Sequence, residues 1–204
     1  MKMLPPIFFV TLFFTAASTT SIAAPAPAPS TTAGASDFIR TNCDTTLYPE
    51  LCYHSLAGYA NAVQQDPARL ARVAVGVSLS RAQRMALYVA NLSRRADYGA
   101  DPRAASALHD CFSVLGDAVD QIRGSVKQMR RLTGSGEEVR FQLSNVQTWM
   151  SAALTNEDTC VDGFEDVADG AVKSDVCDRA LKVKEVTSYK DHEKYGVVTD
   201  KTVS

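Results

Sequence analysis

The sequence contains few of the residue patterns that carry catalysis. Its histidines number only three and stand in unrelated contexts: His54, His109 and His192. No nucleophile elbow, HExxH pair or glycine-rich phosphate loop accompanies them. Cys177 is a further candidate nucleophile, but it lies between Asp175 and Asp178, whose negative charges raise the pKa of a thiol and oppose its reactivity. The sequence therefore does not predict an enzyme.

The sequence also lacks a large excess of positive or negative charge. Lys and Arg number 21 and Asp and Glu number 23, so the formal net charge is -2. One segment is rich in arginine, but these residues lie mainly off the apolar positions of their predicted helix and are interpreted as a solvated face: Arg69, Arg72, Arg81, Arg84, Arg94 and Arg95. The sequence therefore predicts no nucleic-acid partner and no attachment to a membrane surface.

Long apolar runs are confined to the start of the chain. After Met1-Lys2-Met3, residues 4–14 are mainly apolar, and small residues follow up to Ala24. This order is typical of a secretory signal peptide, here residues 1–24. A membrane anchor is the alternative, but two prolines interrupt the run, which is shorter than the roughly 20 apolar residues that span a bilayer. We expect a secreted, soluble mature protein, in which Asn91-Leu92-Ser93 is a candidate glycosylation sequon.

Two further segments lack the apolar spacing of a folded domain. Residues 25–36 consist mainly of Pro, Ala, Ser and Thr, which predicts an extended, mobile linker. Residues 189–204 form a polar, charged tail with no apolar period before Val197. The folded domain is predicted to occupy residues 37–188.

The chain has five cysteines, and a secreted protein meets an oxidising compartment, so disulfides are expected. Eight residues separate Cys43 from Cys52, and Pro49 predicts a turn between two short helices, which a bridge between these cysteines would hold. Zinc is the alternative, but it needs further ligand pairs, and His54 is the only local candidate. The sequence predicts no metal and no cofactor.

The remaining signal is helical, because alternating strand patterns are absent and apolar residues recur at steps of three and four. Asp66-Pro67 and Asp101-Pro102 each combine an N-cap with proline at the first helical position. Breaker segments follow at Thr133–Gly136 and at Asp169-Gly170. We predict an all-α fold, in which three helices of roughly 30 residues and a shorter fourth form an antiparallel up-down bundle after an N-terminal helical hairpin.

The depth of three cysteines in this bundle leaves two pairings open. Cys111 lies 24 residues before Ser135 and Cys160 lies 25 residues after it, so both have about the same height in an antiparallel hairpin. Cys160 and Cys177 are equally symmetric about the turn near Asp169. Helical geometry alone permits either bridge.

Several motifs resemble those of a known family, the plant invertase and pectin methylesterase inhibitors. They are Tyr48–Cys52, Leu108–Cys111, Asp117–Asp120, Val146–Thr155 and Asp158–Phe164, together with the order and spacing of four cysteines. The resemblance runs from about Phe38 to Ser188. It implies a secreted inhibitor of the plant cell wall, or apoplast, with no catalysis of its own. It also implies the bridges Cys43–Cys52 and Cys111–Cys160, with Cys177 as a free thiol.

Members of this family block either pectin methylesterases or acid invertases. The invertase inhibitors carry a Pro-Lys-Phe element where this chain has Val139-Arg140-Phe141, without the proline. The blocks Trp149–Thr155 and Thr159–Asp162 resemble the pectin methylesterase branch and the inhibitory pro-regions of those enzymes. The expected partner is therefore pectin methylesterase, with acid invertase as the alternative. The further hypotheses are a secreted helical carrier of small apolar ligands and a non-inhibitory relative.

The expected mechanism is a 1:1 complex in which one bundle face covers the enzyme's carbohydrate groove. The candidate contact residues are Asn156, Glu157, Asp158, Thr159 and Asp162, whose side chains can bond the polar groups of such a groove. Ordinary helix solvation is the alternative for the two aspartates. Carboxylates at the interface predict binding that depends on pH and is tighter in mildly acidic fluid.

The chain departs from the family pattern at its last helix. After Val186-Thr187-Ser188, Tyr189–Lys194 replaces the usual Asn and the run of Ala and Leu. A truncated last helix would expose apolar side chains of the other helices, each costing about 1.5–3 kcal/mol. We expect either the N-terminal hairpin or a homodimer partner to cover them.

Overall fold

The computed structural model describes residues 31–96 and 101–188, and within these ranges every regular element is a helix. In chain order the elements are α1 (Thr31–Cys43), α2 (Pro49–Leu56), the 3-10 helix η1 (Ala57–Tyr59), α3 (Ala60–Val63), α4 (Pro67–Ser93), α5 (Pro102–Arg130), α6 (Glu137–Asp162) and α7 (Ala171–Thr187). The predicted signal peptide and the polar tail lie outside the described residues.

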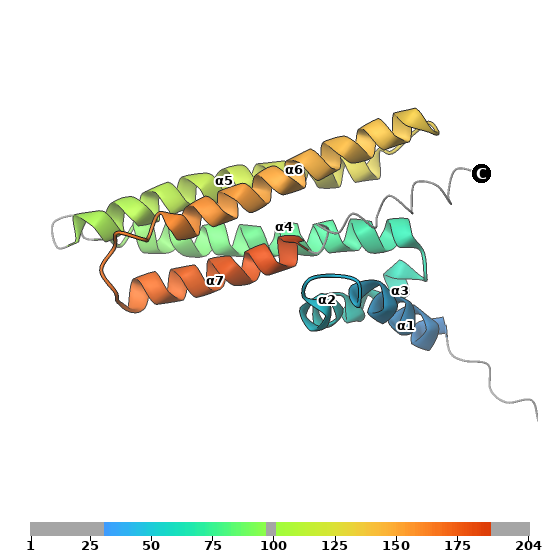
Figure 1. Cartoon of the computed structure of the whole chain (residues 1–204), viewed down its shortest axis with the longest axis horizontal. Coiled ribbons are helices and arrows are strands. Elements are labelled where there is room, and N and C mark those ends of the chain that lie inside the picture. The colour runs from blue at the N-terminus through green and yellow to red at the C-terminus, as the bar shows by residue number, and fades with distance from the viewer. Residues whose placement is uncertain (1–30, 97–100, 189–204) are drawn as a thin grey trace, which may run out of the picture.

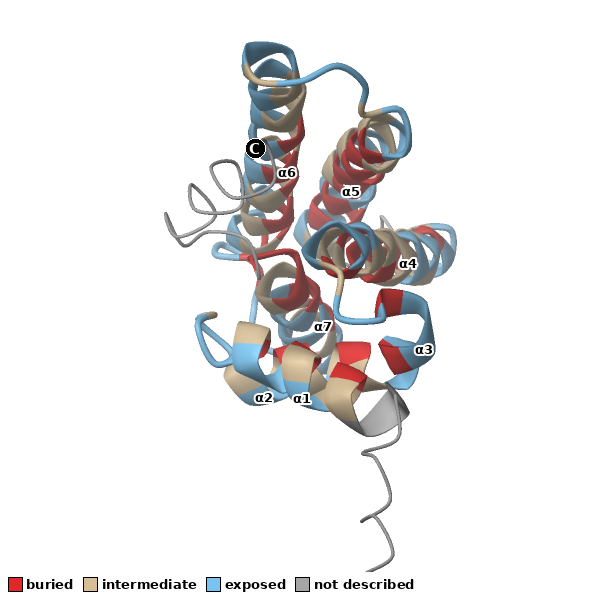
Figure 2. Cartoon of the chain, turned by 90° about the vertical axis from the view of Figure 1, so that its right-hand side faces the viewer, coloured by how far each residue is buried: buried red, intermediate tan, exposed pale blue. Residues whose placement is uncertain are grey.

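Helices α4 to α7 form the predicted antiparallel bundle (Figure 1). They contain 27, 29, 26 and 17 residues, which confirms three long helices and a shorter fourth. Helices α5 and α6 pack along each other, while α7 lies against both α6 and α4 (Figures 1 and 2). The all-α four-helix architecture expected from the sequence is therefore correct.

The helix boundaries follow the predicted local signals. The Asp66 carboxylate accepts hydrogen bonds from the backbone amides of Ala68 and Arg69, at 2.8 and 3.1 Å. Asp101 accepts one from Ala104, at 3.0 Å. Each aspartate satisfies backbone donors that a helix leaves unpaired at its start, and the proline beside it has no such donor. Both predicted helix starts are confirmed.

The turn between α5 and α6 depends on glycine. Gly134 and Gly136 have φ values of +83° and +58°, a region that side-chain-bearing residues seldom adopt. The Gln142 side chain holds this turn, since its Nε2 donates to the Thr133 carbonyl at 2.8 Å. The two helices can therefore reverse direction within a few residues.

One apolar core fills the bundle, because each helix turns its stripe of apolar residues inward. Leu115 and Ile122 of α5, Val146 of α6 and Val176 of α7 are all 0% exposed, as is Phe164 just after α6. Buried residues line the inside of the bundle in the end-on view (Figure 2). Fully burying such a side chain contributes about 1.5–3 kcal/mol.

The N-terminal hairpin of α1 and α2, extended by η1 and α3, packs below α4 and α7 (Figure 2). Ile39, Leu56 and Val63 form a second apolar cluster that includes Val186, at the end of α7. One of the two covers expected for the short last helix, the N-terminal hairpin, thus contacts its end.

The predicted linker extends too far into the folded part. Helix α1 begins at Thr31, six residues before Asp37, so residues 31–36 are helical. Ala35 is 2% exposed and belongs to the second apolar cluster. Alanine favours helix, and the burial of Ala35 stabilises α1. The composition of residues 25–36 did not indicate this contact.

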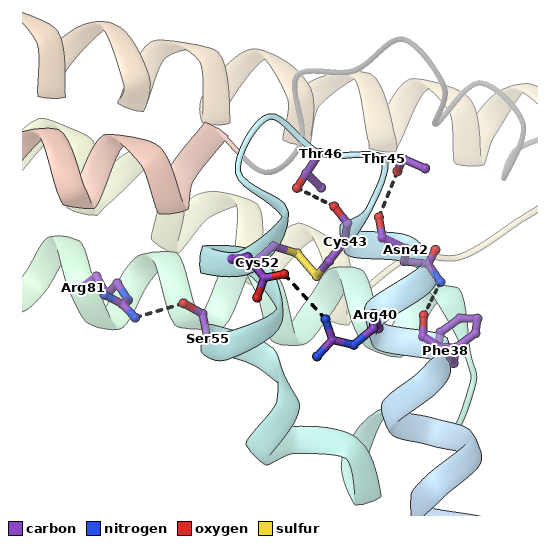
Figure 3. The surroundings of a disulfide bond; sticks show 10 residues. Phe38, Arg40, Asn42, Cys43, Thr45, Thr46, Cys52, Ser55 and Arg81 are labelled. Atoms are coloured by element: carbon purple, nitrogen blue, oxygen red, sulfur yellow. Dashed lines mark hydrogen bonds and ion pairs between the residues drawn. A yellow bond between two sulfur atoms is a disulfide. The ribbon is translucent and has the colours of Figure 1, made fainter.

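Two disulfides hold the chain together, and they are the pairs that the family resemblance implies. Cys43 and Cys52 join α1 to α2, with a Cα–Cα distance of 5.5 Å (Figure 3). Cys111 and Cys160 join α5 to α6, with a Cα–Cα distance of 4.2 Å. Cys177 is a free, half-buried thiol on α7. The Cys160–Cys177 bridge that geometry had left open does not form.

We predict that the two bridges stabilise the protein unequally. In the chain-entropy account, closing the 49-residue separation of Cys111 and Cys160 contributes about 4 kcal/mol, and closing the nine-residue separation of Cys43 and Cys52 about 2.5 kcal/mol. In a Cys177→Ala background, which removes disulfide exchange, urea unfolding of C111A/C160A should therefore show the larger loss of unfolding free energy. An equal or larger loss for C43A/C52A would contradict this.

Candidate functional site

The last two turns of α6 carry the predicted contact residues. Thr159 and Asp162 are exposed and Asp158 is partly exposed. If Asp158 is position i of the helix, Thr159 is i+1 and Asp162 is i+4, so the three side chains share one surface. We call Asp158, Thr159 and Asp162 the α6 polar face. Two carboxylates and one hydroxyl give this face hydrogen-bond acceptors, and the Thr159 hydroxyl donates its proton to the Thr155 carbonyl at 2.8 Å.

An ion pair fixes this face relative to the neighbouring helix. Asp158 Oδ1 lies 2.5 Å from Nζ of Lys184 on α7. The hydrogen bond to the Asp158 carboxylate is the main cause of the raised pKa of Lys184. Both side chains remain more than a third exposed, so water screens the pair and its contribution to stability is small. Its consequence is positional, because it restricts where the Asp158 carboxylate points.

Asn156 belongs to the predicted set but turns toward α5. Its Nδ2 donates to Gln121 Oε1 at 3.0 Å, and the side chain is half-buried. The hydrogen bond joins α5 to α6. Asn156 is therefore placed at the edge of the α6 polar face rather than within it.

Glu157 is not on the surface, so its assignment as a contact residue is wrong for this structure. It is 0% exposed and lies in the core stripe Val146, Met150, Ala153, Glu157, Cys160 and Phe164. The steps along this stripe are four, three, four, three and four, and Glu157 fills the position between Ala153 and Cys160. The helical spacing therefore indicated that Glu157 is buried, but we interpreted it as a surface residue because glutamate is charged.

Burial sets the protonation of Glu157. Loss of solvent raises the pKa of its carboxyl group to about 8, and the nearby Asp158 carboxylate adds to this effect. Thr187 and Lys184, from α7, act in the opposite direction. The Oε2 atom has no hydrogen-bond partner among the described residues. Glu157 is therefore mainly neutral in mildly acidic solution.

Glu157 contacts the last turn of α7 through the Thr187 hydroxyl. The Thr187 hydroxyl oxygen lies 3.0 Å from Glu157 Oε1 and 3.1 Å from the Val183 carbonyl oxygen. A hydroxyl has one proton, so it cannot donate to both acceptors fully. The Thr187 hydroxyl therefore shares its proton between Glu157 Oε1 and the Val183 carbonyl. This chain of hydrogen bonds ties the core of α6 to the last turn of α7.

The other candidate groups lie apart from this region. Burial is the main cause of the raised pKa of the Cys177 thiol, and Asp178 contributes less, so the acidic neighbours named from the sequence are not the chief reason for its low reactivity. Asn91 is exposed on α4, where its Oδ1 accepts from Arg94. His54 and His109 are exposed on α2 and α5, and His192 is outside the described residues.

The described residues contain neither a metal-binding cluster nor a membrane-spanning helix. His, Cys, Asp and Glu side chains do not gather there in any group of three that could hold a metal ion. Within the same residues, no helix combines the length and the apolar character that crossing a bilayer requires.

Comparisons with known proteins agree on one family. Residues 37–189 match the family described as Plant invertase/pectin methylesterase inhibitor. The chain is 40% identical over 187 residues to Pectinesterase inhibitor 11 of Arabidopsis thaliana, covering 88% of this chain and 91% of that protein. It is 40% identical over 158 residues to Pectinesterase inhibitor 3 of the same plant, covering 76% of each chain.

The fold agrees with a solved structure as well. It resembles the crystal structure of a mutant form of a pectin methylesterase inhibitor from Arabidopsis, with a TM-score of 0.59 at 20% sequence identity. The match covers 74% of this chain and 91% of that one. At this identity the likeness concerns the fold.

We predict that Glu157 makes the protein less stable as the pH rises. Its pKa is higher in the folded than in the unfolded chain, so the unfolded state releases the proton first, and unfolding is favoured progressively from about pH 4.5 to about pH 8. At about 1.4 kcal/mol per pKa unit, the loss amounts to a few kcal/mol.

Urea unfolding across this pH range is the measurement. Glu157→Gln keeps the shape of the neutral acid and cannot ionise, so its stability should fall much less with pH. Glu165→Gln, which changes an exposed carboxylate nearby, should follow the unmodified protein. A decline of equal steepness in E157Q would refute the role of Glu157.

Proposed function

Because the chain belongs to the plant invertase/pectin methylesterase inhibitor family, we propose that it is a secreted protein that inhibits a pectin methylesterase in the plant cell wall. The observation that carries this proposal is the 40% identity to a pectinesterase inhibitor over nearly the whole of both chains. The family is one of non-catalytic inhibitors, in agreement with the expectation that the chain is not an enzyme.

The proposed mechanism is occlusion by a rigid face in a 1:1 complex. The α6 polar face would enter or cover the groove in which the enzyme holds its polysaccharide. Enzyme groups that otherwise bond sugar hydroxyls and carboxylates would bond Asp158, Thr159 and Asp162 instead. A convex helix face can do this without a pocket of its own, because the recess belongs to the enzyme.

The surroundings of this face support such a mechanism, since they keep it in one conformation. Cys160, beside Thr159, is bonded to Cys111 of α5, and Asp158 is paired with Lys184 of α7. A face that is already ordered loses less conformational entropy when it binds. Three helices therefore contribute to the position of three side chains.

A function as carrier of small apolar ligands has little support. An apolar cavity lies between the N-terminal hairpin, α4 and the end of α7, but its volume is only about 40 Å³. That is room for one or a few water molecules, whereas pockets for small ligands measure about 300–1,000 Å³.

Acid invertase as the target and a homodimer as the working form both lack support. The two relatives compared above are named as pectinesterase inhibitors, and neither is named as an invertase inhibitor. A homodimer was expected only as a cover for the short last helix, and the N-terminal hairpin already contacts the end of that helix. Signal-peptide removal, apoplastic location and glycosylation at Asn91 remain part of the proposal.

We predict selective inhibition that depends on the α6 polar face. The oxidised protein, titrated in parallel against a plant pectin methylesterase and an acid invertase, should inhibit the first with micromolar or tighter affinity and leave the second active. Replacing both aspartates in D158N/D162N should raise the inhibition constant at least tenfold, because charged hydrogen bonds to the enzyme are weakened, typically by about 1.5–3 kcal/mol each.

The matched control is E137Q/E138Q, which removes two exposed carboxylates from the opposite end of the same helix. This end lies about 30 Å away at 1.5 Å per residue. The control should inhibit as the unmodified protein does. Inhibition of neither enzyme would end the proposal, and equal weakening in both double variants would remove the α6 polar face from it.

We also predict that inhibition weakens as the pH rises from mildly acidic to neutral and above. The pKa of Glu157 is about 8, so its carboxyl group ionises as the pH approaches this value. A buried charge is unfavourable, so ionisation loosens the contact between α6 and α7 directly beneath the face. The inhibition constant should therefore rise by up to about twofold between about pH 5.5 and pH 8, where Glu157 is half ionised, and by several-fold at about pH 9, and E157Q should reduce the part of this rise that arises from the inhibitor. An inhibition constant that stays level over this range would show that the idea is wrong.

A further inference from the structure

A cationic hollow lies between α4 and α7, on a surface that the proposed inhibition does not use. Its volume is about 230 Å³. The two helices that form its walls lie beside each other (Figure 1). We call it the basic groove, and it is lined by Arg81, Arg84, Met85 and Tyr88 of α4 and by Arg179, Lys182 and Val183 of α7.

Most of the positive charge in the basic groove is not neutralised. Asp175 is paired with Arg179, whose Nε lies 2.9 Å from its Oδ1. Among the described residues, no carboxylate lies within 4.0 Å of Arg81, Arg84 or Lys182. The four cations and one paired anion leave an excess of three positive charges, on a chain whose formal net charge is -2.

Neutral groups orient the three arginines of the basic groove. Arg81 donates to the Ser55 hydroxyl of α2 at 3.0 Å, which Figure 3 shows, and Arg84 donates to Ser80 at 2.6 Å. The Arg179 guanidinium lies over the Tyr88 ring, 4.5 Å from its centroid. These contacts orient the side chains, and those of Arg81 and Arg84 leave the charge available to a ligand.

We propose that the basic groove binds a polysaccharide that carries carboxylates, namely the demethylated form of pectin. This rests on the proposed function, which places the protein beside an enzyme that converts pectin methyl esters to carboxylates. Guanidinium groups bind carboxylates through paired, charge-assisted hydrogen bonds. Met85, Tyr88 and Val183 supply an apolar base against which the faces of sugar rings pack.

The arrangement of the cations suits a linear ligand with repeated charges. Arg81 and Arg84 are one turn apart on α4, and Arg179 and Lys182 are one turn apart on α7. The two cations of each helix are therefore about 4.5 Å apart along the helix axis. A polyuronate has one carboxylate on each sugar, so successive sugars can meet successive cations. An excess of three charges, without a row of stacking aromatics, suits a nucleic-acid strand less well.

The basic groove and the α6 polar face point in different directions. Lys182 lines the groove and Lys184 pairs with Asp158, and residues two apart on a helix point about 200° away from each other. Helix α7 thus lies between the two surfaces. The protein can bind polysaccharide on one side while the other side meets an enzyme, which would concentrate the inhibitor where methyl esters have already been removed.

The test measures binding of the oxidised, full chain to oligogalacturonate and to its fully methyl-esterified counterpart, with no enzyme present. The unmodified protein should bind the acidic oligomer at least tenfold more tightly than the ester, and the affinity should fall as salt is added. Arg84→Gln with Lys182→Gln should weaken this binding at least tenfold. Both side chains are exposed, so the variant should keep its fold, which circular dichroism and thermal unfolding will check.

The matched control is Lys127→Gln with Arg130→Gln, which removes the same number of charges from exposed positions on α5. It should bind the acidic oligomer within twofold of the unmodified protein. Equal affinity for acid and ester, equal weakening in the control, or tighter binding of a single-stranded oligonucleotide would each overturn the assignment. Because the assay contains no enzyme, its failure is separate from a failure to inhibit pectin methylesterase.

Discussion

The seam between α5 and α6 is the constraint on which the rest of the structure depends. Two apolar stripes face each other along these helices, and the Cys111–Cys160 bridge locks their relative height. Glycine at two positions lets the chain reverse between them. Helices α4 and α7 then pack on this hairpin, and the N-terminal hairpin packs on α4 and α7. The α6 polar face is the outer side of the seam, so its rigidity comes from the core beneath it.

Glu157 of α6 is the one buried carboxylate among the described residues, and it faces α7. Burying an ionisable group is unfavourable unless it becomes neutral, and its raised pKa is the consequence. The neutral acid bonds Thr187 and so links the core of α6 to the last turn of the short α7. A leucine would pack there without any dependence on pH. The carboxyl group instead makes the cohesion of α6 and α7, directly under the proposed inhibitory face, stronger below its pKa of about 8 than above it.

Much of the fold could be predicted because its signals are local. Asp66 and Asp101 indicate where helices begin. Apolar residues at steps of three and four define the buried stripe of each helix. Other features depend on which elements meet. The heights of the cysteines along the helices did not determine which one pairs with Cys160. Arg81 and Arg84 were interpreted as a solvated face, because the sequence does not show that they lie beside Lys182 of α7. Glu157 was misplaced for a different reason, since its charge was given more weight than its position in the stripe.

The central claim is that the seam presents the α6 polar face, already ordered, to a pectin methylesterase. Amide NMR spectra of the labelled protein, recorded as unlabelled enzyme is added, test this most directly because they locate contacts residue by residue. We expect the largest changes at residues 155–162 of α6 and around Lys184 of α7, with little change in the first half of α4. Changes confined to the N-terminal hairpin or to the basic groove, with residues 155–162 unaffected, would contradict the claim.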